Sequence, residues 1–286
     1  MLMIEVNGLS KHFGRLAALD NLSFQVATGE AVALWGANGA GKTTALRCLL
    51  GLIPFVGKVS IAGLDVAKQG KAARRMVGFV PQELTFHDDL TVTETLTFYA
   101  RLKKVSADYD FATLLDRLQL KPHIGKRVGD LSGGLKQRLA LALALLADPP
   151  ILLLDEPSAN LDIRARDDFL NLLNELKEAG KTIIFSSHRL DVVTTLADRV
   201  LLLEAGKLVV DAPPSELEQR LGLPSTLHLY MPQAMAMMAL DTLQAQGLPV
   251  HLNGRGVRVQ VVPGGKGSVL KMLHEAGVEI DDFVVE

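Results

Sequence analysis

A glycine-rich stretch, GANGAGKT at residues 36–43, has the residue types and the spacing of a phosphate-binding loop. The apolar run AVALW precedes it and a helical pattern follows it, so we expect a buried strand, the loop and then a helix. Glycines let backbone N–H groups surround a phosphate, the lysine reaches the outer phosphates, and the next hydroxyl can coordinate Mg²⁺. The expected phosphate-binding residues are Gly36, Asn38, Gly39, Ala40, Gly41, Lys42, Thr43 and Thr44, with Thr43 also an Mg²⁺ ligand.

Two acidic residues, Asp155 and Glu156, directly follow the apolar run ILLL. If this run is a parallel strand, both acids lie at the carboxyl edge of the sheet, where the phosphate loop also lies. Asp155 is then expected to hold Mg²⁺ through water, and Glu156 to orient and deprotonate an attacking water. An acidic turn is the alternative for this pair by itself, but the phosphate loop favours the catalytic interpretation.

Two other polar side chains end strand-like runs. Gln82 ends VGFVPQ, and His188 ends TIIFSSH. The strand-end position favours a catalytic role for His188 over a structural or surface role. The side-chain oxygen of Gln82 can meet the metal or the water, so Gln82 is an expected metal ligand and catalytic residue.

The stretch LSGGLKQR at residues 131–138 starts a long apolar helix with two glycines. Ser132 is a good N-cap by itself, and each glycine in a helix costs up to about 1 kcal/mol relative to alanine. Helix propensity therefore does not explain Gly133 and Gly134.

The order of elements predicts an α/β fold. Alternating apolar and polar residues at the start of the chain predict a small antiparallel β-layer, and later strands and helices alternate as in a doubly wound sheet. Residues 84–147 are expected to form a mostly helical insertion. A later amphipathic helix is built on Phe169, Leu172, Leu173 and Leu176, and Gly180 caps it.

The pattern changes near residue 220. The following segment has a β-α-β-β-α-β order if Asn253 and Gly254 turn a hairpin, which is typical of a ferredoxin-like domain. We therefore expect a nucleotide-binding domain over 1–220 and a small C-terminal α+β accessory domain over 221–286.

Composition restricts the partners of this 286-residue chain. Lys and Arg total 30 against 32 Asp and Glu, and the resulting formal net charge of −2 predicts no nucleic-acid partner. A single cysteine, Cys48, and the absence of a leader-like pattern in MLMIEVNG predict a cytoplasmic protein. The longest apolar runs are shorter than the roughly 20 residues that cross a bilayer, so a membrane role needs a partner.

Taken together, these residues resemble the ATP-binding cassette of ABC transporters over about residues 3–215. Phe13 matches the aromatic that stacks on adenine in this family, with an ordinary core aromatic as the alternative. The motifs occur in the family order: the phosphate loop, Gln82 as the Q-loop, LSGGLKQR as the signature, Asp155 and Glu156 as the Walker B pair, SANLD at 158–162 as the D-loop and His188 as the switch histidine.

The resemblance implies a P-loop NTPase (RecA-like) core with an antiparallel β-subdomain and a helical subdomain, which binds ATP and Mg²⁺. It also implies a second cassette, expected to be a second copy, that packs head to tail with the first. ATP would lie between the phosphate loop of one copy and the signature helix of the other, so the expected nucleotide-binding residues include Ser132, Gly133, Gly134 and Asp162. Transmembrane permease subunits would dock near Gln82 and residues 84–105, which places the chain peripherally on the inner face of the cell membrane.

Two departures from the family pattern indicate which group of ABC ATPases the chain resembles. Leu135 stands where the signature most often has glutamine, and Ala37 stands where the phosphate loop most often has proline. Neither change removes a catalytic group. An apolar residue at the position of Leu135 is similar to ATPases of the ABC-2 type exporter group, so the expected direction of transport is export.

The main alternative is a soluble ABC ATPase that acts on DNA or ribosomes. Too few residues separate Gly36 from Ser132 for the coiled-coil arms of chromosome-maintenance ATPases, and translation factors of this superfamily carry two cassettes. A small GTPase is excluded because no Asn-Lys-x-Asp motif occurs.

A copper-handling exporter is a further variant, since four thioethers lie close together in the sequence and Cu(I) prefers such ligands. They belong to Met231, Met235, Met237 and Met238. Packing of these side chains on a small sheet is the favoured interpretation.

Overall fold

The computed structural model describes residues 2–106, 109–221, 225–262 and 264–285. The chain divides into two compact units, Met1–Pro214 and Ser215–Glu286. This division lies close to the change of pattern seen near residue 220, and it assigns the short helix α8 (Leu217–Leu221) to the second unit. Each unit is described by itself below.

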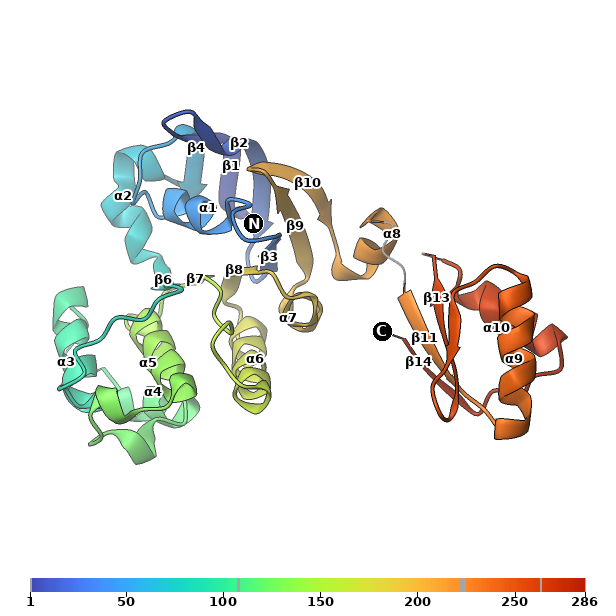
Figure 1. The fold of residues 1–286 in the computed structure, drawn as a ribbon. Helices are drawn as coiled ribbons and strands as arrows, with labels where there is room; N and C mark the ends of the chain where they lie inside the picture. Colours follow the sequence, from blue (N-terminus) through green and yellow to red (C-terminus); the bar gives the residue numbers. More distant parts are fainter. Residues whose placement is uncertain (1, 107–108, 222–224, 263, 286) are drawn as a thin grey trace. The chain divides into compact units, whose positions relative to one another are not determined.

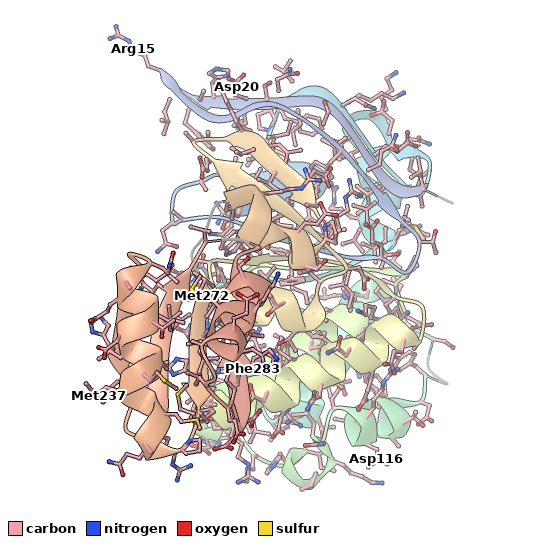
Figure 2. All side chains as sticks on the ribbon, turned by 90° about the vertical axis from the view of Figure 1, so that its right-hand side faces the viewer. Arg15, Asp20, Asp116, Met237, Met272 and Phe283 are labelled. Atoms are coloured by element: carbon pink, nitrogen blue, oxygen red, sulfur yellow. The ribbon has the colours of Figure 1, made fainter. Side chains whose placement is uncertain are left out.

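An antiparallel sheet opens the first unit, with the strand order β2-β1-β4-β5. Its strands are β1 (Leu2–Phe13), β2 (Leu16–Ala27), β4 (Val56–Ile61) and β5 (Leu64–Asp65). Apolar side chains alternate along β1 and β2 because one face of this sheet is buried and the other is exposed to solvent. Figure 2 shows Arg15 at the tip of the hairpin that joins the two long strands. The antiparallel β-layer predicted from the sequence is therefore confirmed.

A mostly parallel sheet forms the core of the first unit, with the order β10-β9-β3-β8-β7-β6. Its strands are β3 (Ala31–Trp35), β6 (Val77–Val80), β7 (Ile151–Leu154), β8 (Thr182–Ser187), β9 (Arg199–Glu204) and the antiparallel edge strand β10 (Lys207–Ala212). Every position of β7 and β8 is buried, which explains the continuous apolar runs at residues 151–154 and 183–185. The order places β8 between β3 and β7, so three strands that are distant in the sequence end side by side.

One set of helices accompanies these two sheets. They are α1 (Lys42–Leu49), α2 (Val66–Arg75), α6 (Ile163–Glu178) and α7 (Leu190–Leu196). The apolar side of α1 joins one buried cluster with the inner face of the antiparallel sheet and with the core strands (Figure 1). Helix α6 buries the four predicted positions Phe169, Leu172, Leu173 and Leu176, which confirms the amphipathic helix.

Helices α3 (Val92–Lys103), α4 (Phe111–Arg117) and α5 (Gly133–Leu145) form a helical group, in which α5 also packs against β6 (Figure 1). Two short 3₁₀ turns, Lys121–His123 and Val128–Asp130, connect α4 to α5. Helices occupy most of residues 92–145 within the predicted mostly helical insertion 84–147, and residues 84–91 contain no helix. The helix begins only at Val92 because Thr91 and Glu94 form a capping box, in which each side chain accepts a hydrogen bond from the other residue's backbone N–H.

The second unit has the predicted β-α-β-β-α-β order. Its elements are β11 (Ser225–Tyr230), α9 (Gln233–Ala245), β12 (Val250–Leu252), β13 (Gly256–Val261), α10 (Lys266–Glu275) and β14 (Asp282–Val285). The strands pair antiparallel in the order β12-β13-β11-β14, and both helices pack on one face of this sheet (Figure 1). This strand order is the ferredoxin-like arrangement. In the hairpin, the Asn253 side chain accepts a hydrogen bond from the Arg255 N–H, as predicted for a turn at this position.

The four clustered methionines lie in different surroundings. Met231 is buried and Met235 packs against the apolar core of the second unit, whereas Met237 and Met238 are exposed. Figure 2 shows Met237 on the side of α9 that points away from the strands. These positions favour the packing interpretation over a shared copper site.

None of the helices that the structure describes combines the length and the apolar character needed to cross a membrane.

Candidate nucleotide-binding site

The loop between β3 and α1 requires glycine at two positions. Gly36 and Gly41 have positive φ angles of 150° and 106°. A Cβ atom at Gly36 would lie 2.4 Å from the Leu203 carbonyl oxygen, and a Cβ atom at Gly41 would lie 2.6 Å from the Ala18 carbonyl oxygen. The loop therefore packs too closely on neighbouring backbone for any side chain at these positions.

The Lys42 ammonium lies inside this loop. Its Nζ donates hydrogen bonds to the carbonyl oxygens of Gly36 at 2.7 Å and Ala37 at 3.2 Å. The same Nζ lies 3.4 Å from Glu156 Oε1, and both side chains are buried, with 6% and 8% of their surfaces exposed. The structure thus joins the phosphate loop to the acid at the end of β7.

A hydrogen-bonded group of oxygens surrounds Asp155. The Thr43 hydroxyl donates to Asp155 Oδ1 at 3.0 Å, and the Ser186 hydroxyl donates to the same oxygen at 2.6 Å. The Asp155 carboxylate is almost completely buried. Since Mg²⁺ prefers oxygen ligands and combines few protein ligands with phosphate oxygens, Thr43 and Asp155 are suitable residues for holding this ion.

Glu156 has a left-handed backbone conformation, with φ of 46°. Such a conformation costs about 1 to 3 kcal/mol for a residue other than glycine and persists where its surroundings enforce it. Its N–H donates to Ser186 Oγ at 2.7 Å, and its Oε2 lies 3.0 Å from His188 Nδ1. The structure therefore brings together Glu156 and His188, two of the three residues that were predicted to be catalytic from separate strands.

The segment after His188 is held by an exposed ion pair. The Arg189 guanidinium donates two hydrogen bonds to the Asp191 carboxylate, at 3.1 and 2.8 Å. These bonds hold the pKa of Asp191 below its usual value and raise the pKa of Arg189. The pair connects the end of β8 to the first turn of α7.

A cavity of about 640 Å³ lies in front of the phosphate loop. Its lining contains Gln82 and Glu156 together with most of the predicted loop residues: Asn38, Gly39, Ala40, Gly41, Lys42, Thr43 and Thr44. Phe13 also lines the cavity and is 51% exposed, so the alternative of a core aromatic is wrong. The Lys11 ammonium lies 4.8 Å from the centroid of the Phe13 ring.

Several residues of the site were not found from the sequence. Leu16, Ala17, Ala18 and Ala205 also line the cavity, and Leu16 pairs directly with Phe13 across the hairpin. Ser186 was missed as well, although a hydroxyl near the end of an otherwise apolar buried strand is a usable signal.

The predicted signature and D-loop residues are absent from the lining of this cavity. Ser132 caps α5, where its hydroxyl accepts a hydrogen bond from the Leu135 N–H at 3.4 Å. Asp162 caps α6 in the same way, accepting from the Ala165 N–H at 2.8 Å. Ser132, Gly133 and Asp162 are exposed. A single chain therefore does not bring these predicted nucleotide-binding residues to its own phosphate loop.

Comparison with known proteins agrees with this geometry. A family model described as ABC transporter matches residues 19–159, which include the phosphate loop, the signature and the Walker B pair. A second model, described as AAA domain, putative AbiEii toxin, Type IV TA system, matches residues 127–193. A Nod factor export ATP-binding protein I of Burkholderia orbicola is 36% identical over 264 residues, which cover 91% of this chain and 86% of that protein. The chain belongs to the ATP-binding proteins of ABC transporters.

Other members of this family support the same assignment. The Nod factor export ATP-binding protein I of Rhizobium etli is 39% identical over 76% of this chain and 70% of that protein. The solved structure of an ATP-binding subunit of an ABC transporter matches with a TM-score of 0.69 and 29% identity, covering 77% of this chain and 94% of that one. The predicted P-loop NTPase fold and the predicted exporter-type ATPase subunit are confirmed.

An ATP-binding cassette bound to ADP and Pi, in a dimeric post-hydrolysis state, matches this ABC ATPase with a TM-score of 0.67 and 27% identity. The match covers 74% of this chain and 99% of that one.

Proposed function

We propose that two copies of this ABC ATPase hydrolyse ATP at composite sites and thereby drive a membrane permease that exports its substrate. The observation that carries this proposal is the set of contacts that joins Lys42 to Glu156, Glu156 to His188, and Thr43 to Asp155. Ser132 does not line the cavity at this loop; its hydroxyl caps α5 instead.

The predicted site residues at the phosphate loop have separate roles in this proposal. Lys42 binds the outer phosphates of ATP, and Phe13 stacks on the adenine. Thr43, Gln82 and Asp155 hold Mg²⁺, which neutralises charge on the phosphate oxygens when it is bound. The loop N–H groups from Gly36 to Thr44 surround the phosphates.

Glu156 acts as the general base. It orients a water and accepts its proton while the water oxygen bonds to the γ-phosphorus and the bond to the oxygen bridging the β- and γ-phosphates breaks. His188 Nδ1 is within hydrogen-bond distance of Glu156, so it keeps the carboxylate directed at the cavity. The reaction therefore needs no further protein base.

The second copy completes the site. In the proposed head-to-tail homodimer, the N-terminus of α5, with Ser132, Gly133 and Gly134, faces the γ-phosphate held by the partner, and Asp162 lies at the same interface. The positive end of the α5 dipole favours an anion at this position. The solved cassette in a dimeric post-hydrolysis state supports the dimer in this proposal.

The permease is proposed to dock beside Gln82. A smaller cavity of about 230 Å³ lies there, between the loop after β6 and helices α3 and α5, and is lined by Phe79, Pro81, Leu84, Thr85, Phe86, Tyr99, Lys103, Ala140 and Leu143. Phe98 and Leu102 on α3 are exposed, at 45% and 63%. Docking would hold the chain on the cytoplasmic face of the membrane. No nucleic-acid partner is proposed, given the net charge of −2.

ATP hydrolysis by the purified chain tests the catalytic part of the proposal. Glu156→Gln should bind ATP and Mg²⁺ but not turn over, because the amide cannot accept the proton of water. Glu178→Gln, at an exposed position near the end of α6, is the matched control and should keep the parent rate. ATP hydrolysis by Glu156→Gln at the parent rate would show that Glu156 is not the general base.

Mixing two inactive variants tests the composite site. Lys42→Ala damages the phosphate loop and Ser132→Arg damages the signature, so each homodimer should be inactive. A mixed dimer keeps one site in which the loop and the signature are both intact, so activity should return on mixing. Continued inactivity of the mixture, with dimers present, would contradict the head-to-tail site.

A further inference from the structure

Ser186, near the end of β8, connects the two acidic residues at the end of β7. Its hydroxyl is fully buried and makes two hydrogen bonds of opposite direction. It donates to Asp155 Oδ1 at 2.6 Å and accepts from the Glu156 N–H at 2.7 Å. A serine hydroxyl has one proton to donate, so these two bonds determine its orientation.

The bond to Glu156 acts on an unusual backbone conformation. Glu156 has φ of 46°, and a left-handed residue other than glycine needs support from its surroundings. The direction of the Glu156 side chain follows from this conformation, because the Cβ position depends on the backbone. In this conformation its two carboxylate oxygens lie 3.4 Å from Lys42 Nζ and 3.0 Å from His188 Nδ1.

The bond to Asp155 acts on the other acid. Asp155 Oδ1 accepts from both Ser186 and Thr43, so the carboxylate is held from β8 and from α1 at the same time. Neutral serine changes no charge at the site. Ser186 therefore acts on geometry. It sets the position of Asp155, the proposed Mg²⁺ ligand, relative to Glu156, the proposed base.

We propose that Ser186 is a positioning residue for ATP hydrolysis, which holds the Glu156 backbone in its left-handed conformation and the Asp155 carboxylate toward Thr43. This inference rests on the proposed function of Glu156 as the base. The inference gives β8 a second role, in addition to placing His188, which directly follows this strand.

Thr182 offers a matched control on the same strand. Its side chain is also fully buried, and its Oγ1 accepts a hydrogen bond from the Gly29 N–H at 2.9 Å. Thr182→Val and Ser186→Ala each leave one backbone N–H without its partner, but only Ser186 touches the proposed catalytic acids. A general effect of losing a buried hydroxyl should therefore appear in both variants.

The test compares Ser186→Ala, Ser186→Thr and Thr182→Val in kcat, in ATP Kd and in amide hydrogen exchange of the peptide 154–158 without nucleotide. Ser186→Ala should lower kcat by about 10- to 100-fold, as expected for a displaced catalytic group, and leave the ATP Kd near the parent value. Its 154–158 amides should exchange faster. Ser186→Thr keeps the hydroxyl and should retain most of the turnover, and Thr182→Val should turn over like the parent.

Parent-like kcat in Ser186→Ala would overturn the proposal, as would an equal fall in Thr182→Val or in Ser186→Thr. The Glu156→Gln variant separates this failure from that of the proposed function. If Glu156→Gln is inactive and Ser186→Ala is parent-like, only the role of Ser186 is wrong. If Glu156→Gln hydrolyses ATP at the parent rate, the assignment of Glu156 as the base is wrong, whatever the result for Ser186→Ala.

Discussion

Lys42 Nζ lies 3.4 Å from Glu156 Oε1, so the cation of the phosphate loop is paired with the acid proposed to be the base. A phosphate that binds in the loop competes with Glu156 for this ammonium. Both groups are buried and have lost hydration by water. If one of them is removed, the charge of the other loses the ion pair that offsets this loss of hydration. Nucleotide binding would thus release one carboxylate oxygen while His188 still holds the other.

Lys42→Met should weaken ATP binding and also destabilise the fold. Loss of a charged hydrogen-bond donor to phosphate corresponds to about 10- to 100-fold in Kd. The unfolding free energy should fall by about 1 to 3 kcal/mol, because Glu156 keeps its charge without the lysine. The double variant Lys42→Met with Glu156→Gln should recover part of this loss in a chemical denaturation series. Additive losses in the double variant would contradict the coupling.

Gly133→Ala should separate folding from dimerisation. Gly133 is the first residue of α5, and its φ angle is not in the left-handed region. A Cβ atom there would meet its nearest neighbour, the backbone oxygen of Asn160, at 3.7 Å, which is an ordinary contact distance. Alanine should therefore maintain or raise stability, by at most about 1 kcal/mol. The added methyl group should weaken ATP-driven dimerisation, because it occupies the space proposed for the partner's phosphate. Light scattering with ATP, in the Glu156→Gln background, measures this effect.

Gly267→Ala is the matched control for that experiment. Gly267 is also in the first turn of a helix, α10, with open space at its Cβ position. It should show the change in stability without the change in dimerisation. Equal dimerisation by both variants would show that Gly133 does not face the partner's nucleotide.

Phe13→Ala should raise the KM for ATP with little change in kcat. Phe13 lines the cavity and is proposed to stack on the adenine, not on the phosphate where the reaction occurs, so it should contribute to binding in the ground state and in the transition state alike. Base–aromatic stacking corresponds to about 1 to 3 kcal/mol, or roughly 5- to 150-fold in affinity. Phe13→Trp should retain the parent KM, and a large fall in kcat in either variant would argue against stacking.

Phe98→Asp should reduce the membrane-bound fraction without changing ATP hydrolysis by the isolated chain. Phe98 is exposed on α3 and does not line the nucleotide cavity, so a charge there should affect the proposed permease contact and leave the nucleotide site unchanged. Sedimentation of membranes from cells that express the variant measures the bound fraction. Val56→Asp, at an exposed apolar position of β4, is the matched control, and an equal loss in both variants would contradict docking at α3.

Cys48 should be unreactive in the folded protein. It is fully buried, and burial raises the pKa of its thiol to about 11 from 9.0. The folded state therefore disfavours the thiolate, so this group lowers the unfolding free energy as the pH rises from about 9 to about 11 and has no such effect below that range. Iodoacetamide at pH 8 should label Cys48 only after denaturation, and Cys48→Ala should remove the contribution to the pH dependence. Rapid labelling of native protein would contradict the burial.

Parts of the fold followed from local patterns. The loop at residues 36–43 lies within one short stretch, so its glycines and Lys42 define it without any long-range contact. The order of the second unit was also predictable, because its strands alternate and Asn253 marks the turn. Helix α3 was predictable from the apolar spacing in TVTETLTFYARL, and the capping box of Thr91 and Glu94 sets its start at Val92.

The sequence by itself determined the chemistry of this protein: a phosphate loop, two acids, a glutamine and a histidine, in an order that identifies an ABC ATPase. Tertiary structure decided which of these groups meet. Only the strand order places β8 between β3 and β7, and this brings Ser186 to within 2.6 Å of Asp155 Oδ1. The physical reason is that spacing along the chain specifies local conformation, whereas distances between residues far apart in the sequence depend on how parallel strands are ordered in the sheet.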